Sequence, residues 1–98
     1  MRISQKDVDR VIYGYETTRL IGVGVCKTIL VNDLSVGMKV MFNYGSVSTV
    51  TDIRLVTPKT VEIFYDGGGS QKRRLTSRIV GFYGSDNNVL ARSLKHGA

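Results

Sequence analysis

The densest group of reactive side chains in this sequence is cationic. Lys72, Arg73 and Arg74 are consecutive, Arg78 follows closely, and no aspartate or glutamate occurs within residues 67–85. In a strand, alternation places Lys72 and Arg74 on one face and Arg73 on the other. Beside a glycine-rich turn, these groups would reach the phosphates of a polyanion. The alternative is a solvated strand edge, because basic residues also protect edges against aggregation.

Aromatic residues accompany this cluster and provide candidate stacking surfaces. The apolar alternation over residues 60–65 predicts a strand in which Tyr65 faces the core and Phe64 faces outward. Tyr44, in a predicted turn, is a second exposed candidate. An outward aromatic ring beside arginines is the arrangement that base stacking uses. The alternative for Phe64 is burial under an N-terminal helix whose apolar stripe needs a surface.

Residues that support catalysis or metal binding are sparse. His96 is the only histidine, Cys26 is the only cysteine and lies in an apolar run, and the carboxylates are scattered. The pattern contains neither a zinc-ligand set nor a nucleophile elbow. The glycine-rich segment 66–70 lacks the Gly-Lys-Ser/Thr ending of a phosphate-binding loop. We therefore expect a protein that is not an enzyme and uses no cofactor and no metal.

A helix followed by short strands is predicted to position these groups. Over residues 4–16 the apolar side chains fall on one helical face. The segment Leu20–Val31 is rich in β-branched residues and predicts one long bent strand or two short ones. The tail over 84–98 is predicted to form a linker and one short helix. Between these segments the sequence predicts strands at Lys39–Phe42, Val47–Val56 with a bulge near Asp52, Thr60–Tyr65, Gln71–Leu75 and Ile79–Tyr83.

Four segments of the stretch over residues 34–83 form a recognisable pattern: Leu34–Val40, Thr49–Ile53, Val61–Gly67 and Thr76–Arg78. With these segments the stretch resembles the SH3-like small β-barrels of the Tudor and KOW type, which occur in bacterial and phage proteins. The resemblance implies a mostly β fold, with a barrel of about five strands over 20–83. With the two predicted helices flanking this barrel, residues 1–98 form a single domain. Such barrels bind RNA, DNA or peptides through loops and one sheet face.

Composition restricts the classes of partner. The chain has 98 residues, a formal net charge of +6 and a hydrophobic fraction of 42%, which is typical of a small globular protein and favours anionic partners. The first residues lack the apolar core of a signal peptide, and the apolar run over 20–26 is too short to span a bilayer. We therefore expect a cytoplasmic protein that is not inserted in a membrane.

The sequence favours a basic module that binds nucleic acid, either DNA or RNA. One alternative is a phage-type accessory or inhibitor protein that binds an acidic or nucleic-acid-binding surface of a host protein complex. The other is an oligomeric assembly protein in which the segment 20–31 pairs with its copy. In the favoured interpretation Lys72, Arg73, Arg74 and Arg78 capture the polyanion, Lys39, Arg54 and Lys59 add to the field, and Tyr44 or Phe64 stacks on bases.

Overall fold

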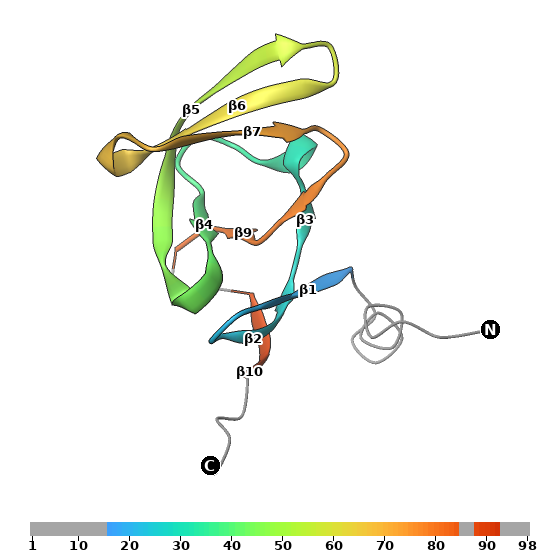
Figure 1. The fold of residues 1–98 in the computed structure, drawn as a ribbon, viewed down its shortest axis with the longest axis vertical. Coiled ribbons are helices and arrows are strands. Elements are labelled where there is room, and N and C mark those ends of the chain that lie inside the picture. The colour runs from blue at the N-terminus through green and yellow to red at the C-terminus, as the bar shows by residue number, and fades with distance from the viewer. Residues whose placement is uncertain (1–15, 85–87, 93–98) are drawn as a thin grey trace, which may run out of the picture.

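Short strands arranged in three sheets make up most of the fold (Figure 1). The computed structural model describes residues 16–84 and 88–92. Three short 3-10 turns connect strands: η1 (Val31–Asp33), η2 (Asn43–Gly45) and η3 (Asp66–Gly68). In chain order the strands are β1 (Thr17–Leu20), β2 (Gly24–Lys27), β3 (Ile29–Leu30), β4 (Lys39–Met41), β5 (Val47–Thr57), β6 (Thr60–Tyr65), β7 (Ser70–Arg74), β8 (Arg78–Ile79), β9 (Gly81–Phe82) and β10 (Val89–Arg92).

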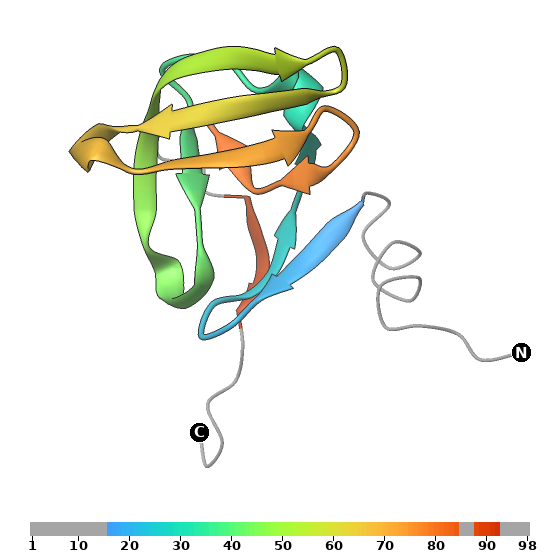
Figure 2. The ribbon, with the colours of Figure 1, turned by 45° about the horizontal axis from the view of Figure 1, so that its top comes forward.

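The largest sheet has the strand order β7-β6-β5-β4-β9, and its long strand β5 belongs to two layers. The first residues of β5, from Val47 to Thr49, pair with β4, whereas the residues from Val50 onward pair with β6. The register shifts between Val50 and Asp52, so the predicted bulge is confirmed. Figure 2 shows β5 bending sharply, which turns β6 and β7 across the end of β4.

Two smaller sheets complete the enclosure of the core. One has the order β1-β2-β10, and the other consists of β3 and β8. Only Thr28 separates β2 from β3, and only Val80 separates β8 from β9, so the chain passes directly from one sheet to the next. A main cluster built around the fully buried Val40 and Ile63 lies between the sheets, and a second cluster surrounds Cys26. Cys26 is thus fully buried, in keeping with the apolar run in which it lies.

In the part of the chain that the structure describes, the prediction of flanking helices is wrong. In the described ranges the helical elements are 3-10 turns of three residues. Residues Val89–Arg92, expected in a short helix, form strand β10, which pairs antiparallel with β2. So short an apolar pattern is compatible with a helix and with a strand. The strand forms because its backbone can hydrogen-bond to the edge of β2 that would otherwise be open. The helix expected over 4–16 lies outside the described residues except for Glu16, which is not helical.

The segment Leu20–Val31 follows the alternative with two short strands. Gly22 lies in the turn that connects β1 to β2, at a φ of +75° that favours glycine. The segment Ile79–Tyr83 is likewise divided, between β8 and β9. None of the helical turns in ranges 16–84 and 88–92 has the length and apolar character needed to cross a membrane.

Candidate nucleic-acid interface

Alternation and register bring three of the predicted cations, Arg54, Lys72 and Arg74, to the outer side of β5, β6 and β7, and Lys59 is exposed in the turn between β5 and β6. In β6 the inward residues are buried and the outward ones are partly exposed. Across the outer side, Arg54 is opposite Glu62, and Glu62 is opposite Lys72. Arg74 is opposite Thr60 in the next row. We call the outward residues Arg54, Lys59, Phe64, Lys72 and Arg74 the basic face.

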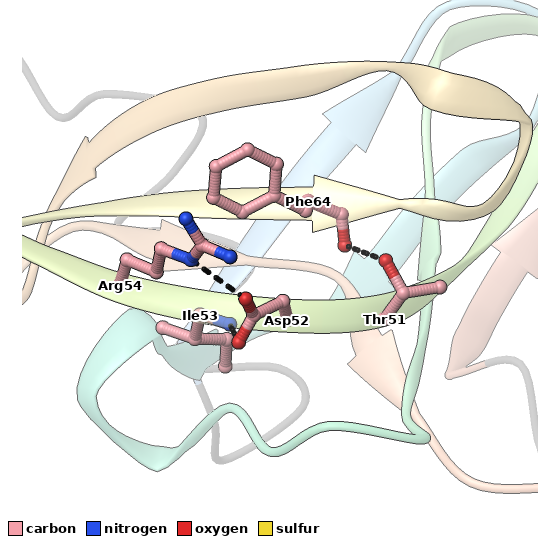
Figure 3. A network of polar contacts seen from close by, with 5 residues as sticks. All are labelled: Thr51, Asp52, Ile53, Arg54 and Phe64. Atoms are coloured by element: carbon pink, nitrogen blue, oxygen red, sulfur yellow. Dashed lines mark hydrogen bonds and ion pairs between the residues drawn. The ribbon is translucent and has the colours of Figure 1, made fainter.

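Within the basic face, an arginine lies over an aromatic ring (Figure 3). The guanidinium carbon of Arg54 is 5.2 Å from the ring centroid of Phe64, within the range of a cation–π contact. The Thr51 hydroxyl donates to the carbonyl oxygen of Phe64 at 3.2 Å and so ties β5 to β6 at this point. Phe64 is partly exposed, as its outward position in the alternation predicts. The pair presents a planar cation and an aromatic ring, the two groups on which nucleic-acid bases stack.

Two carboxylates from neighbouring strands reduce the charge of this surface. Asp52 accepts a hydrogen bond from Nε of Arg54 at 2.8 Å, and this contact is the main reason why the pKa of Asp52 is lowered. Glu62 lies between Arg54 and Lys72 and accepts a hydrogen bond from the Ser70 hydroxyl at 2.9 Å. The sequence around the basic run contains no acidic residue, but the folded surface does, because β5 and β6 place Asp52 and Glu62 beside the cations.

Lys59 and Arg74 meet at the end of the β5–β6 hairpin. Both line an open cavity of about 370 Å³, together with Pro58, Leu75 and Thr76. The backbone N–H of Leu75 donates to the carbonyl of Lys59 at 2.9 Å, which holds the hairpin end against the end of β7. Two exposed cations at the rim of such a cavity form a suitable position for one phosphate group.

Arg73 and Arg78 lie elsewhere, on the inner side of the sheets. Arg73 is half-buried, whereas its neighbours Lys72 and Arg74 are exposed, so the predicted alternation is confirmed. Arg73 Nη2 donates to the carbonyl oxygen of Arg78 at 2.8 Å. Both arginines line a cavity of about 350 Å³ that is separate from the basic face.

The remaining two predicted site residues are dispersed. Lys39, on β4, is opposite Thr49 on one side and Phe82 on the other, and is half-buried. Tyr44 is 78% exposed in η2, at the turn between β4 and β5. Its backbone has a φ of +67° and its N–H donates to the carbonyl of Ile21. Tyr44 is thus fixed to the β1–β2 turn and not to the basic face.

Sequence reasoning missed the acids Asp52 and Glu62 as members of this surface. The strict alternation over 60–65 already places Glu62 on the same side as Phe64, so that signal was present. For Asp52 the bulge hides the signal, because an inserted residue changes which side chains point outward. Among the described residues, no group of three or more histidine, cysteine, aspartate or glutamate side chains is placed to hold a metal ion.

Comparison with known proteins adds no relative: no family model, no curated protein and no solved structure matches this chain. The resemblance of residues 34–83 to SH3-like barrels therefore stays a prediction. Any statement about function depends on the geometry of the chain itself.

Proposed function

We propose that this protein is a non-catalytic, SH3-like module that binds single-stranded nucleic acid on the basic face. The observation that carries the proposal is the contact between Arg54 and Phe64, with Lys72 in the same cross-strand row as Arg54. The strand order supports the barrel, because β9, the last strand of the five-stranded sheet in chain order, returns to pair with β4, and β5 bends between two layers.

In the proposed mechanism phosphate contacts provide affinity and ring stacking provides the preference for unpaired bases. Arg54, Lys59, Lys72 and Arg74 neutralise phosphates and release counterions. Phe64 presents a ring to one base, and Arg54 extends the stacking surface. Bases in a duplex are already stacked on each other, so the ring favours single strands.

Fluorescence anisotropy with labelled single-stranded DNA, single-stranded RNA and duplex DNA tests this proposal. Four phosphate contacts predict that log K falls against log salt with a slope of roughly −3 on a single strand, at about 0.7 per contact. The slope is measured between about 50 and 200 mM salt. An absence of binding to all three probes at the lower salt concentration ends the proposal.

Matched charge variants separate the basic face from general electrostatic attraction. Replacing Lys72 and Arg74 by glutamine together should weaken binding about tenfold or more at low salt, since two phosphate contacts are lost. The control replaces Arg19, exposed on β1, and Lys39, on β4, by glutamine and removes the same charge elsewhere. If both double variants lose the same affinity, net charge explains the binding and the basic face is not its site.

A second pair of variants tests the ring. Phe64→Leu keeps an apolar side chain but removes the π surface, and stacking of one base is worth roughly 1–3 kcal/mol. We expect an affinity loss of about fivefold to a hundredfold for Phe64→Leu and little change for Phe64→Tyr. Equal affinities of the leucine variant and the parent would remove stacking from the mechanism.

The alternative of an accessory protein predicts a different outcome. A complex with another protein that survives nuclease treatment, together with no direct binding to the three nucleic-acid probes, favours a protein partner. For the assembly alternative, β2 has both edges paired, by β1 and β10, so a second copy would have to pair with β3, within the segment 20–31, or with β1, which ends at Leu20.

A further inference from the structure

A cavity between β1 and β7 is not used by the proposed function. Its volume is about 350 Å³, at the lower end of the range of roughly 300–1,000 Å³ for small-ligand sites. Among the described strands, β1 and β7 are edge strands of two different sheets and are not hydrogen-bonded to each other, so the cavity lies open between them. Residues in or next to β1, β4, β7 and β8 line it, among them Leu20, Phe42, Gln71, Arg73 and Arg78.

Two arginines give this cavity its charge. The lining contains Arg73 and Arg78 but no aspartate or glutamate. In residues 16–84 and 88–92 neither guanidinium has a carboxylate within ion-pair distance. Arg73 donates to the carbonyl of Arg78, and Arg78 donates to the hydroxyl and carbonyl oxygens of Thr28. Because each guanidinium has five N–H groups, both retain donors for a ligand.

Holding two half-buried cations together without a counter-ion costs free energy, and a bound anion would remove that cost. The surroundings of Arg73 are apolar on the core side. Tyr65 has a buried hydroxyl with no hydrogen-bond partner in the described part of the chain, and burial raises its pKa to about 12 while the charge of Arg73 opposes the rise. Arg73 is thus close enough to the buried Tyr65 hydroxyl to act on its pKa.

The rest of the lining indicates what kind of anion fits. Apolar side chains from β1, β4 and the segment 79–80 form one part of the cavity, with the ring of Phe42 among them. Phe42 is fixed by an edge-to-face contact with Tyr65, with ring centroids 5.4 Å apart. A phosphodiester chain is polar along its length and has no apolar group that would cover this part of the cavity. A carboxylate attached to an apolar body matches both parts.

We propose that this cavity binds an organic carboxylate through Arg73 and Arg78, with the apolar body of the ligand against Phe42 and its neighbours. The arginine fork matches the two oxygens of a carboxylate, which allows paired N–H···O bonds. The same chemistry is found in a free hydrophobic acid and in the C-terminal residue of a peptide. Binding of either kind does not depend on the nucleic-acid proposal.

The first experiment uses the unmodified protein and two probes of nearly the same shape. 3-Phenylpropionate carries the carboxylate, and 3-phenylpropionamide replaces it with an uncharged group. Titration followed by ¹H–¹⁵N NMR should shift Gln71 and the Nε–H signals of Arg73 and Arg78 with the acid. The amide should bind at least about tenfold more weakly, because it lacks the charge. Equal affinity of acid and amide, or no shifts at these residues with the acid, overturns the proposal.

Adjacent residues of β7 provide the matched variants. Arg73→Gln should reduce 3-phenylpropionate affinity at least about tenfold and change single-stranded DNA affinity less than threefold. Lys72→Gln, one residue away on the outer side, should have the reverse effect. The NMR spectrum reports whether each variant is folded, and the comparison of acid with amide on the unmodified protein decides the question if Arg73→Gln is not. Loss of 3-phenylpropionate binding in Lys72→Gln but not in folded Arg73→Gln would contradict the assignment.

A third pair of probes identifies the source of the carboxylate. The tripeptide Ala-Leu-Phe with a free C-terminus is compared with the same peptide carrying a C-terminal amide. Tighter binding of the free-acid peptide than of 3-phenylpropionate, with loss on amidation, supports a peptide C-terminus as ligand. Binding of 3-phenylpropionate alone supports a small hydrophobic acid. If neither carboxylate shifts the cavity residues, the site is rejected.

Discussion

Arg78 and Thr28 are fifty residues apart in the chain and are joined by two hydrogen bonds. Arg78 Nε donates to the Thr28 hydroxyl at 2.8 Å, and its Nη2 donates to the Thr28 carbonyl at 3.0 Å. Thr28 is the buried residue between β2 and β3, and Arg78 begins β8. The contact therefore fixes the point where the chain leaves the β1-β2-β10 sheet and joins the sheet of β3 and β8.

Replacing this arginine should destabilise the fold. Arg78→Gln removes charge-assisted bonds to a buried residue, and we expect the free energy of unfolding to fall by about 2 kcal/mol. Urea unfolding followed by circular dichroism measures the change. Arg74→Gln, at an exposed position, is the control and should stay within about 0.5 kcal/mol of the parent. A similar loss in both variants would show that the Thr28 contact contributes nothing specific.

The buried Tyr65 hydroxyl predicts a stability loss at alkaline pH. Its pKa is raised from 10.0 to about 12, mainly by burial. Between these values the unfolded chain has released the proton and the folded protein retains it. Titration of this group therefore does not change the free energy of unfolding below about pH 10. As the pH rises from 10 toward 12, the free energy of unfolding falls by about 1.4 kcal/mol per pH unit.

Tyr65→Phe isolates this contribution. Below pH 10 the variant should be as stable as the parent or more stable, because the hydroxyl it loses has no partner in the described residues. Above pH 10 the parent should lose stability faster than the variant. Urea unfolding of both proteins at pH 8 and pH 11 provides the comparison, and parallel losses would place Tyr65 in a more solvated environment than the structure indicates.

The acids among the cations predict a gain of function. Glu62→Gln removes the carboxylate between Arg54 and Lys72 and should raise affinity for single-stranded DNA about threefold at low salt. Asp52→Asn frees Arg54 from its ion pair and should act in the same direction. Anisotropy titrations at two salt concentrations measure both effects, which should shrink at high salt because these charges are exposed. If Glu62→Gln binds single-stranded DNA with unchanged affinity at low salt, the phosphates do not bind at the row of Arg54, Glu62 and Lys72.

Contact between two turns makes Gly22 hard to replace. A Cβ at Gly22 would lie 3.1 Å from Cδ1 and 3.4 Å from Cα of Tyr44, and its φ of +75° is strained for other residues. We expect Gly22→Ala to cost about 2 kcal/mol or more. Gly67→Ala has a similar φ of +84° with no atom near the added Cβ, so it should cost about 1 kcal/mol. Thermal unfolding of the two variants measures the difference, which reports the steric clash with Tyr44. If both variants lose the same stability, the cost comes only from the strained backbone and not from the contact with Tyr44.

Several features could be predicted from local sequence. The alternation over 60–65 predicts Phe64 outward and Tyr65 inward, and the same period separates Lys72 and Arg74 from Arg73. The bulge near Asp52 is also visible as a slip in the alternation. These predictions succeed because strand side chains alternate with a period of two, which depends only on neighbours in the chain.

Other features depend on contacts between segments that are distant in sequence. Val89–Arg92 becomes a strand because β2 presents an open edge, and a pattern of four residues cannot encode that edge. The sequence alone thus determined a basic, β-rich chain and the two faces of strands β6 and β7. The alternation separates Arg73 from Lys72 and Arg74, but only the tertiary structure decided what each group meets, since burial and charge pairing depend on which strands are neighbours. Arg73 joins Arg78 at a cavity against β1, and Lys72 and Arg74 lie beside Arg54 and two acids.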